Sequence, residues 1–401
     1  MLDRKSVVKN RLTIVQILPA LDAGGVERGT LEIAAALVAA GHRSVVVSTG
    51  GRLVEELEKS GSEHIVMPVA AKRPWTLLGT KRLRRVLETL AADIIHARSR
   101  VPAWLAYLAW RRMPNSTRPR FVTTVHGFYS VNRYSAVMTR GERVIAVSNS
   151  IRTYIAEQYA VDMAKVVTIY RGIDRTAHPF GFVPAKSWLR EWRQPDGAVN
   201  IAGLHTPMRA GEQQRVTQTL GFDVRVPLIT LAGRLTRLKG HETFIDLMTE
   251  LKRRGIAAHG LIVGAEDAKR RPYAQALYER ACDVPITFLG HRQDLREIMT
   301  QSRLVLSLST QPESFGRTVL EALSLGRPVI GFDHGGVGEI LGALYPQGRI
   351  SVASNLDALA DKVSSFIAEA PTVPDHSQFA LRTMQSNTLK LYEELAQGRA
   401  P

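Results

Sequence analysis

Two glutamates in one amphipathic stretch are the most informative candidate ligand-binding residues in the sequence. Glu313 precedes Ser314, Phe315 and Gly316, and Glu321 lies eight positions beyond Glu313. At 3.6 residues per turn, the second carboxylate lies about two turns along a helix from the first. The two carboxylates could then meet opposite ends of one ligand, and backbone N–H groups at the helix start favour anions. A simpler alternative is a helix that carries Glu near its N-terminus because the dipole favours it.

A basic loop in the second half could bind phosphate. Arg234, Arg237 and Lys239 lie between two glycines, directly after a predicted strand at 228–231. Arg grips phosphate bidentately, and Lys supplies a point charge. Because parallel α/β sheets bind ligands beyond the carboxyl ends of their strands, we favour an anion-binding loop over a solvated basic turn.

Two features of the first half could face the same ligand. Gly24 and Gly25 lie at the predicted start of a helix, where a ligand can approach the backbone N–H groups. The pair does not fit the G-x-G-x-x-G pattern, which argues against a simple dinucleotide oxidoreductase. His126 ends a predicted strand at 121–126, and an imidazole there can hydrogen-bond a hydroxyl or donate to a phosphate. Taken alone, each feature is more simply a tight turn or a structural histidine.

The elements that must position these residues alternate between short apolar runs and amphipathic stretches. Such a rhythm is typical of parallel sheets covered on both faces, so we predict two doubly wound α/β domains. Strands are predicted at 12–18, 44–48, 65–69, 93–96, 121–126, 143–147, 228–231, 258–263, 286–289, 304–308 and 328–332. Helices are predicted at 27–40, 74–91, 101–112, 244–253, 273–282, 295–300, 319–325 and 377–395.

The alternation breaks between the two domains. We place the first domain at 1–175, a linker with an insertion at 176–226, and the second domain at 227–374. The linker is rich in Pro and Gly, and its part 199–211 has no assigned role. A final helix at about 377–397 is expected to pack back on the first domain.

The positive charge is concentrated in the first half. The net charge is +16, and residues 1–180 carry 27 Lys and Arg against 14 Asp and Glu, whereas the rest carries 26 against 23. This asymmetry predicts an anionic partner for the first half. The stretch 75–87 could present a basic amphipathic face to anionic lipid, or Leu83, Val86 and Leu87 could be core residues beneath solvated charges. Further residues that could join this face or meet a phosphate-bearing acceptor are Trp104, Tyr107, Trp110, Arg111 and Arg112.

Composition limits the compartment and the class of protein. Cys282 is the only cysteine, so no intrachain disulfide can form, and the charged N-terminus is unlike a signal peptide. No apolar stretch approaches 18 residues without a charge. We expect a cytoplasmic protein whose membrane contact, if present, is peripheral on the inner face of the cytoplasmic membrane. The basic residues are scattered through α/β units and form no nucleic-acid-binding module.

The ordered set of motifs resembles family 4 of the retaining, nucleotide-sugar-dependent glycosyltransferases of GT-B fold. The set comprises the Gly24-Gly25 turn, His126-Gly127, Arg234 with Lys239, Glu313 with Glu321, and the segment 332–340 as the family's next conserved loop. Arg171-Gly172-Ile173-Asp174 resembles the close of the family's N-terminal domain. Within the family, the segments 97–104 and 127–141 look most like bacterial enzymes that build lipopolysaccharide core or related surface glycans.

The resemblance implies a role for each matching residue at the donor. Arg234 and Lys239 would bind the diphosphate of a UDP-, GDP- or ADP-sugar and stabilise the leaving group. Glu321 would bind the ribose hydroxyls, and Glu313 would bind hydroxyls of the donor sugar. Three backbone N–H groups would support Glu313, namely those of Ser314, Phe315 and Gly316.

The first half would complete the site around the donor. His126 would lie against the sugar and the reaction centre, while Gly24 and Gly25 would let a helix N-terminus approach the donor phosphates. The acceptor would be a glycan or a lipid-linked glycan. No cofactor or metal is expected, since the sequence contains no Asp-x-Asp of the kind that metal-dependent sugar transferases use.

Two alternatives stay open from the sequence. A nucleotide-sugar epimerase of GT-B architecture would need no acceptor. A basic, non-catalytic α/β protein that binds membranes or nucleic acid would account for the pI near 10.2.

Overall fold

Short apolar runs form two separate parallel sheets in the computed structural model of the chain, which describes residues 11–22, 24–69, 76–192, 226–266 and 271–398. The chain divides into one unit of Met1–Gly172 with Phe379–Pro401 and a second unit of Ile173–Gln378. Two doubly wound α/β units confirm the predicted fold class.

The first unit is built on a seven-stranded sheet of order β3-β2-β1-β4-β5-β6-β7, in which every pairing is parallel. Its strands are β1 (Thr13–Ile17), β2 (Arg43–Ser48), β3 (Glu63–Val66), β4 (Ile94–Ala97), β5 (Arg120–Val125), β6 (Arg143–Ala146) and β7 (Val166–Thr168). Its helices are α1 (Gly25–Ala39), α2 (Val54–Lys59), α3 (Thr76–Thr89), α4 (Arg100–Arg111), α5 (Asn149–Gln158), α14 (Leu381–Gln397) and the 3₁₀ turns η1 (Ser135–Thr139) and η2 (Met163–Lys165).

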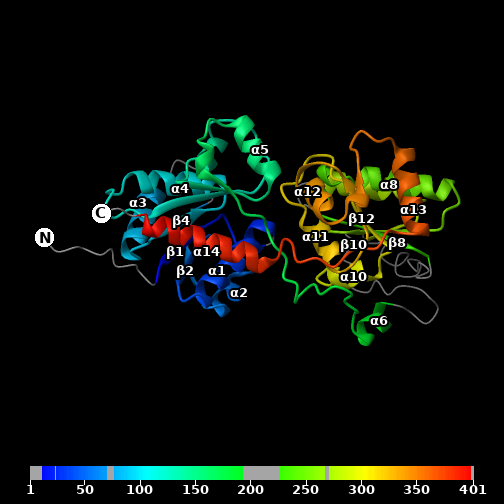
Figure 1. Cartoon of the computed structure of the whole chain (residues 1–401), viewed down its shortest axis with the longest axis horizontal. Coiled ribbons are helices and arrows are strands. Elements are labelled where there is room, and N and C mark those ends of the chain that lie inside the picture. Colours follow the sequence, from blue (N-terminus) through cyan, green and yellow to red (C-terminus); the bar gives the residue numbers. More distant parts are fainter. Residues whose placement is uncertain (1–10, 23, 70–75, 193–225, 267–270, 399–401) are drawn as a thin grey trace. The chain divides into compact units, whose positions relative to one another are not determined.

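Side-chain alternation in β1 shows how this sheet is covered on both faces. Val15 and Ile17 belong to a core cluster with residues of α3, α4 and α5. Ile14 points the other way, into a cluster with α1 and α14. Figure 1 shows α14 beside α1, although the two helices come from opposite ends of the sequence. The last helix is therefore part of the first unit.

The second unit is built on a six-stranded parallel sheet of order β10-β9-β8-β11-β12-β13. Its strands are β8 (Leu228–Ala232), β9 (His259–Val263), β10 (Ile286–Gly290), β11 (Leu304–Ser307), β12 (Val329–Phe332) and β13 (Arg349–Ile350). Its helices are α6 (Lys186–Trp192), α8 (His241–Arg253), α9 (Arg271–Arg280), α10 (Leu295–Gln301), α11 (Arg317–Ser324), α12 (Gly335–Leu344), α13 (Leu356–Ala368) and the 3₁₀ turns η3 (Arg237–Lys239) and η5 (Pro346–Gly348).

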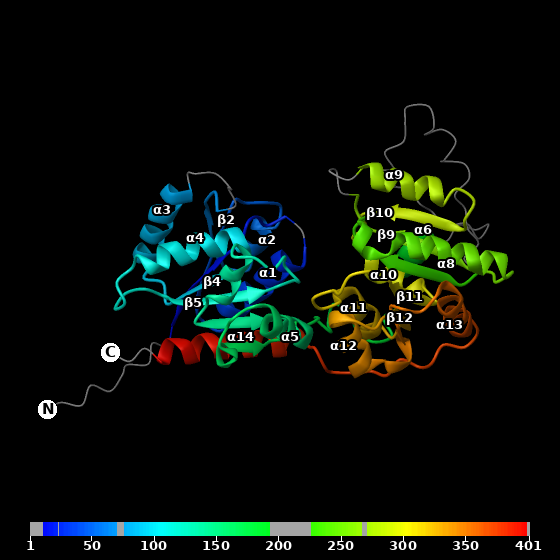
Figure 2. The same ribbon diagram turned by 90° about the horizontal axis from the view of Figure 1, so that it is seen from above.

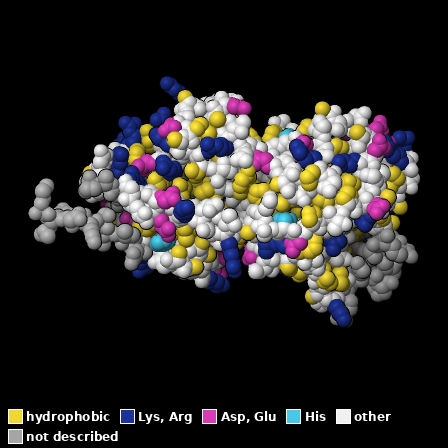
Figure 3. All heavy atoms as spheres, in the orientation of Figure 1, with side chains coloured by type: hydrophobic (Ala, Val, Ile, Leu, Met, Phe, Trp, Pro, Cys, Tyr) yellow, Lys and Arg dark blue, Asp and Glu magenta, His cyan; other side chains and the backbone are white. Residues whose placement is uncertain are grey.

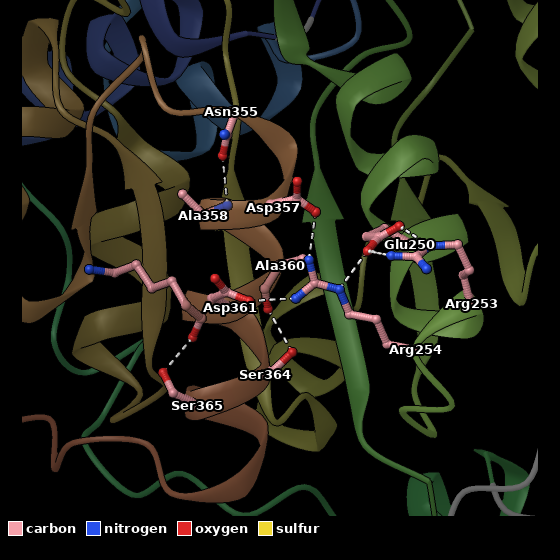
Figure 4. Close-up of polar contacts among 11 residues, drawn as sticks. Glu250, Arg253, Arg254, Asn355, Asp357, Ala358, Ala360, Asp361, Ser364 and Ser365 are labelled. Atoms are coloured by element: carbon pink, nitrogen blue, oxygen red, sulfur yellow. Dashed lines mark hydrogen bonds and ion pairs between the residues drawn. The ribbon is translucent and has the colours of Figure 1, made fainter.

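Helices also cover both faces of the second sheet. On β9, the backbone of Gly260 lies against Phe244 of α8, while the next residue, Leu261, packs in a cluster with α6 and α10. Helix α9 lies along the outer strand β10, where Tyr278 packs edge-on against Phe288 (Figure 2). An ion-pair network centred on Arg254 joins α8 to α13 (Figure 4).

The second unit begins earlier than the sequence predicts. Trp188 and Trp192 of α6 stack at 5.1 Å and pack against Leu228 and Leu261, so the start of the expected linker is part of the second unit. Apolar burial by two tryptophans outweighs the Pro- and Gly-rich composition that suggested a linker. The segment 199–211 lies outside the described residues. Of the segment 332–340, expected to be a loop, residues 335–340 belong to α12.

Candidate functional site

The loops after β8 and β11 meet through one ion pair in the second unit. Lys239 Nζ lies 2.8 Å from Glu313 Oε1, and the side chains are 29% and 23% exposed. Ser309 donates a second hydrogen bond to the same carboxylate oxygen. Within the described part of the chain, no residue hydrogen-bonds Glu313 Oε2. That oxygen is the acceptor left for a hydroxyl group of a ligand.

Charge around Glu313 keeps it ionised. Burial alone would raise the pKa of its carboxyl group, but the nearby ammonium of Lys239 and hydrogen bonds from Lys239 and Ser309 outweigh burial and lower the pKa. Glu313 is therefore a carboxylate at neutral pH, and it lies beside Lys239.

Backbone contacts fix this geometry. The N–H group of Thr310 donates to the carbonyl oxygen of Leu238 at 2.9 Å, which ties the two loops together. Gly240, with a φ of 74°, lies so close to β11 that a Cβ atom would come within 1.8 Å of the oxygen of Leu308. Because any larger residue would push the loops apart, Gly240 holds Lys239 beside Glu313.

Helix α12 supports the same loop from the other side. The N–H group of Gly336 donates to the carbonyl oxygen of Glu313 at 2.7 Å, and His334 Nε2 lies 2.8 Å from the carbonyl oxygen of Ser309. The carbonyl of Ser309 can only accept, so the Nε2 atom of His334 carries the proton in this bond.

Of the other predicted residues, Ser314, Phe315 and Gly316 lie in the segment directly before α11, and Glu321 lies on the helix. Ser314 is partly buried, Phe315 is 3% exposed, and Gly316 directly precedes the first helical residue. Glu321 accepts a hydrogen bond at 3.0 Å from Arg317 Nε and lines an open groove of about 480 Å³.

The predicted cation Arg234 is placed differently from Lys239. Its side chain is exposed and makes no hydrogen bond or ion pair with any other residue that the structure describes. Arg237 in the same loop lies 5.1 Å over the ring of Tyr273 and 3.6 Å from the carboxylate of Glu242. Arg234 therefore has no partner among the described residues, whereas Lys239 is paired with Glu313.

In the first unit, His126 lies in a cluster of basic side chains. A small cavity of about 20 Å³ is lined by His126, His96, Arg98 and Arg171, among others. Burial, together with the charges of Arg171, Arg98 and His96, holds the pKa of His126 well below its usual range. His126 is therefore neutral at pH 7, and its buried Nε2 atom has no hydrogen-bond partner among the described residues.

The Gly24-Gly25 turn reaches the same cluster through Arg171. A guanidinium nitrogen of Arg171 donates to the carbonyl oxygen of Gly25, and a Cβ atom on Gly25 would come within 2.9 Å of that side chain. Gly24 directly precedes α1. The first unit thus brings the start of α1 and His126 together around Arg171, and the second unit brings Lys239 and Glu313 together.

Comparisons with known proteins fit both halves of this arrangement. The family model described as Glycosyltransferase Family 4 matches residues 23–177, and the model described as Glycosyl transferases group 1 matches residues 212–380. The crystal structure of a glycosyltransferase from Rickettsia africae ESF-5 is 27% identical, with a TM-score of 0.75 over 97% of this chain and 100% of that chain. The chain is a family 4 glycosyltransferase of GT-B fold.

Two further proteins are similar over different lengths. The Anabaena protein Alr3699/HepE, solved with UDP-glucose, shares the fold at 18% identity and a TM-score of 0.69, over 96% of this chain and 100% of that chain. The lipopolysaccharide core biosynthesis mannosyltransferase LpcC of Rhizobium leguminosarum bv. viciae is 26% identical over 194 residues, which is 47% of this chain and 53% of LpcC.

As a family 4 glycosyltransferase, the chain is a transferase, which sets aside the epimerase and the non-catalytic alternatives. The part of the chain that the structure describes contains no helix long and apolar enough to span a bilayer.

Sequence reasoning missed several residues that support this glycosyltransferase site. Ser309 and His334 hold Glu313 and its loop, and Arg317 holds Glu321. Arg317 lies four residues before Glu321 on α11, a spacing that could have signalled the pair. Ser309 and His334 carry no such local signal, because the tertiary fold brings their strands together.

Helix α3 turns two leucines into the core of the first unit and exposes basic residues on its other side. Leu83 and Leu87 are fully buried in the core, as the second alternative expects, whereas Val86 is only partly buried. The exposed face of α3 carries Lys81, Arg82 and Arg85. On the face shown in Figure 3, Lys and Arg side chains are interspersed with Asp and Glu rather than gathered in one patch.

The aromatic residues of α4 are part of the same core. Trp104, Tyr107 and Trp110 pack partly buried against it, and Arg118 lies 3.9 Å from the centre of the Trp110 ring. Arg140 and Arg111 lie over the ring of Tyr107.

Proposed function

We propose that this glycosyltransferase moves a sugar from a nucleoside-diphosphate sugar to a glycan or lipid-linked acceptor with retention of the anomeric configuration. The observation that carries the proposal is the Lys239–Glu313 ion pair at the carboxyl ends of β8 and β11. In this pair, Lys239, which would bind the diphosphate, lies beside Glu313, which would bind hydroxyl groups of the sugar.

The chemistry follows from where charge develops. The bond between the anomeric carbon and the diphosphate oxygen breaks, and its electron pair stays on the diphosphate. The acceptor oxygen then bonds to the anomeric carbon on the face that the diphosphate leaves, and its proton is released with the nucleoside diphosphate. Lys239 and Arg234 would stabilise the charge on the leaving group, as positioned donors do in other enzymes. We propose that this suffices without a bound metal, so transfer should persist in a chelator.

Glu313 is better suited to bind the sugar than to attack it. Its Oε1 atom is held by Lys239 and Ser309, and Oε2 is left to accept a hydroxyl hydrogen bond. A retaining glycosidase needs a second carboxyl group about 5–5.5 Å away, and Glu321 lies eight positions further along the chain. His126, being neutral, would accept or donate a hydrogen bond at the sugar without adding a charge.

The test is calorimetric titration of the protein with UDP, GDP and ADP without added metal, followed by the same titration of Lys239→Ala and Glu321→Ala. We expect one nucleotide to bind and both substitutions to weaken it about tenfold or more. If no nucleotide binds to the wild-type protein, the proposal is wrong.

We further propose that the acceptor belongs to lipopolysaccharide core or surface-polysaccharide biosynthesis. The similarity to the mannosyltransferase LpcC supports this class of acceptor. Transfer from the nucleotide-sugar selected above to isolated lipopolysaccharide core or to lipid-linked glycans tests it, and transfer to neither class would contradict it.

A cytoplasmic location and contact with an anionic membrane surface are part of the same proposal. Because the apolar side of α3 is buried, the contact would be electrostatic, through Lys81, Arg82 and Arg85, and would weaken with salt. Cosedimentation with phosphatidylglycerol vesicles at low and high salt measures it, and absence of binding at low salt would refute it.

A further inference from the structure

A long segment of the first unit carries only positive charge. From Arg100 to Gly141 the sequence contains seven arginines and no Asp, Glu or Lys. Arg120 pairs at 2.8 Å with Glu142, which lies just beyond the segment. Arg100 and Arg133 form no ion pair with any residue that the structure describes. Because a guanidinium binds phosphate through two parallel hydrogen bonds, these two arginines are suited to an anionic ligand.

Arg100 lies at the same edge of the sheet as His126. It is the first residue of α4, which follows β4, and His126 directly follows β5. The strands β4 and β5 are parallel neighbours, so both residues lie beyond the carboxyl ends of adjacent strands. A ligand group bound by Arg100 is therefore on the side of the first unit that carries the histidine of the candidate site.

Tyr129 links these two residues. Its hydroxyl oxygen accepts a hydrogen bond at 3.3 Å from the backbone N–H group of His126. Its ring packs against the core of the first unit, and the guanidinium carbon of Arg100 lies 4.7 Å from the centre of that ring. The hydroxyl group of Tyr154 donates to the carbonyl oxygen of Tyr129, which further fixes the loop after β5. One tyrosine thus contacts both His126 and Arg100.

The guanidinium of Arg100 is held in place without using most of its donors. A second ring, that of Tyr134, lies 5.4 Å from its guanidinium carbon. Among the described residues, only Ser135 accepts a hydrogen bond from this side chain, from Nη1 to Oγ at 3.3 Å. Contacts with aromatic faces use none of the five N–H groups of a guanidinium. The side chain is therefore preorganised, and N–H groups are left to bind an anion.

Exposed apolar side chains gather in the loop beside this arginine. Phe128, Val131 and Tyr134 are 36%, 53% and 40% exposed. Arg133 is exposed in the same loop. Apolar side chains that are grouped at a surface and edged by polar groups mark interaction sites. The loop therefore combines an apolar surface for the rings of a glycan with a cation for a phosphate on that glycan.

We propose that Arg100 and Arg133 bind a phosphate group of the acceptor, so that this enzyme selects a phosphorylated glycan. The inference rests on the proposed function, in which the basic loop of the second unit binds the diphosphate of the donor. An anion site of the first unit beside His126 then belongs to the other substrate. A lipid headgroup offers the same phosphate chemistry, but the contacts of Tyr129 tie this site to the histidine that the proposed function places at the sugar.

The test uses core oligosaccharide released from lipopolysaccharide, in its phosphorylated form and after its phosphates are removed with hydrofluoric acid. Each form is titrated calorimetrically into the wild-type protein and into Arg100→Gln, and the ratio of the two affinities is the readout. We expect the wild-type protein to prefer the phosphorylated form about tenfold or more, and Arg100→Gln to lose most of this preference, because hydrogen bonds to charged groups are worth about that factor. Arg133→Gln should reduce the preference about threefold, since an exposed charge contributes less.

Arg140→Gln is the matched control. Arg140 is exposed and also contacts an aromatic ring, since its guanidinium carbon lies 5.4 Å from the centre of the Tyr107 ring. It lies shortly before β6, however, and therefore at the opposite edge of the sheet from His126. Its affinity ratio should equal that of the wild-type protein, and nucleotide affinity should be unchanged in all three variants.

The affinity ratio separates phosphate binding from a structural role. Equal affinity of the wild-type protein for both forms, no binding of either form, or an unchanged ratio in Arg100→Gln would overturn the inference. Equal weakening of both forms in Arg100→Gln would show that the side chain only supports its loop. Cosedimentation with phosphatidylglycerol vesicles that depends on Arg100, together with an unchanged ratio, would assign the site to lipid headgroups instead.

Failure of the inference is distinguishable from failure of the proposed function. If a nucleotide binds to the wild-type protein and the ratio does not respond to Arg100→Gln, only the inference is wrong. If no nucleotide binds to the wild-type protein, the proposed function fails, and the inference falls with it.

Discussion

The two units place their functional polar residues in opposite environments. In the first unit, His96, Arg98, His126 and Arg171 surround a cavity of about 20 Å³, and three of the four are no more than 9% exposed. In the second unit, Lys239 and Glu313 are 29% and 23% exposed, and Glu321 borders a groove of about 480 Å³. The first unit packs its charges into the protein, and the second keeps them at a surface that a ligand can reach.

This difference teaches which residues can be changed without harming the fold. Buried polar groups are costly to leave unpaired, so substitutions in the first cluster should act on stability. Partly exposed pairs contribute less to stability, so substitutions in the second unit should act on binding and transfer.

The largest expected effect comes from Lys239→Ala. Removing this cation should lower kcat for transfer about 100-fold or more, because positioned charges at a leaving group are worth factors of that size. The melting temperature should change little, since the ion pair is partly exposed. Steady-state transfer kinetics and thermal unfolding together measure both effects.

Lys252→Ala is the matched control for this variant. Lys252 donates to the carbonyl oxygen of Asp283 and lies on the exposed surface of the same unit, outside the candidate site. Its kcat should equal that of the wild-type protein. A Lys239→Ala protein with wild-type kcat, or one that unfolds while Lys252→Ala does not, would break the contrast between the units.

A smaller effect, on stability, is expected from Tyr392→Phe in the first unit. The Tyr392 hydroxyl lies 2.5 Å from His96 Nδ1, and Thr124 Oγ1 lies 2.6 Å from the other ring nitrogen, Nε2. Without the hydroxyl, a buried nitrogen of His96 loses its partner, which should lower the free energy of unfolding of that unit by about 1–2 kcal/mol. Urea unfolding followed by circular dichroism measures it, and nucleotide affinity should stay unchanged.

Tyr345→Phe provides the comparison in the second unit. Tyr345 is fully buried, and its hydroxyl donates to the carbonyl oxygen of Pro371 at 2.7 Å. Its loss should destabilise the second unit by a similar amount and leave the first unit unchanged. If Tyr392→Phe unfolds like the wild-type protein, the cluster around His96 is not a stabilising one.

The fold could be predicted from the sequence largely because parallel sheets leave a strong local pattern. Every predicted apolar run overlaps a strand, since buried strands of parallel sheets are continuously hydrophobic. The run at 65–69 shares only two residues with β3, which spans Glu63–Val66 and is partly exposed. The strands β7 and β13 were missed because they have only three and two residues. Helix α6 was missed because two tryptophans outweigh the surrounding prolines and glycines.

The candidate site was predictable only where its signal is local. Glu313, Glu321 and Lys239 are recognised by spacing and by position after strands. The partners Ser309 and His334 come from two different loops, and no local pattern in the sequence indicates that these loops are close in space. The burial of Arg98 and Arg171 could not be predicted either, because arginine is seldom buried and no neighbouring residue pattern indicates burial here.

The smallest expected effect concerns a charged cluster that lies outside the candidate site. Glu250 on α8 accepts hydrogen bonds from Arg253 and Arg254, and Arg254 continues to Asp357 and Asp361 of α13 (Figure 4). These bonds lower the pKa of Glu250 to about 2. A carboxyl group with a lower pKa in the folded state than in the unfolded state stabilises the fold above its unfolded value, about 4.3. That stabilisation is lost as the pH falls through the folded pKa.

We therefore expect Glu250→Gln to unfold more easily than the wild-type protein at pH 6 and equally easily near pH 2. Urea midpoints at several pH values between these limits measure the difference. Glu279→Gln is a suitable control, because Glu279 is exposed on α9 and accepts a hydrogen bond from Gln275. A difference between Glu250→Gln and the wild-type protein that does not shrink with acid would mean that packing, rather than charge, joins α8 to α13. In that event the second unit, like the first, would use polar residues for structure away from its ligand site.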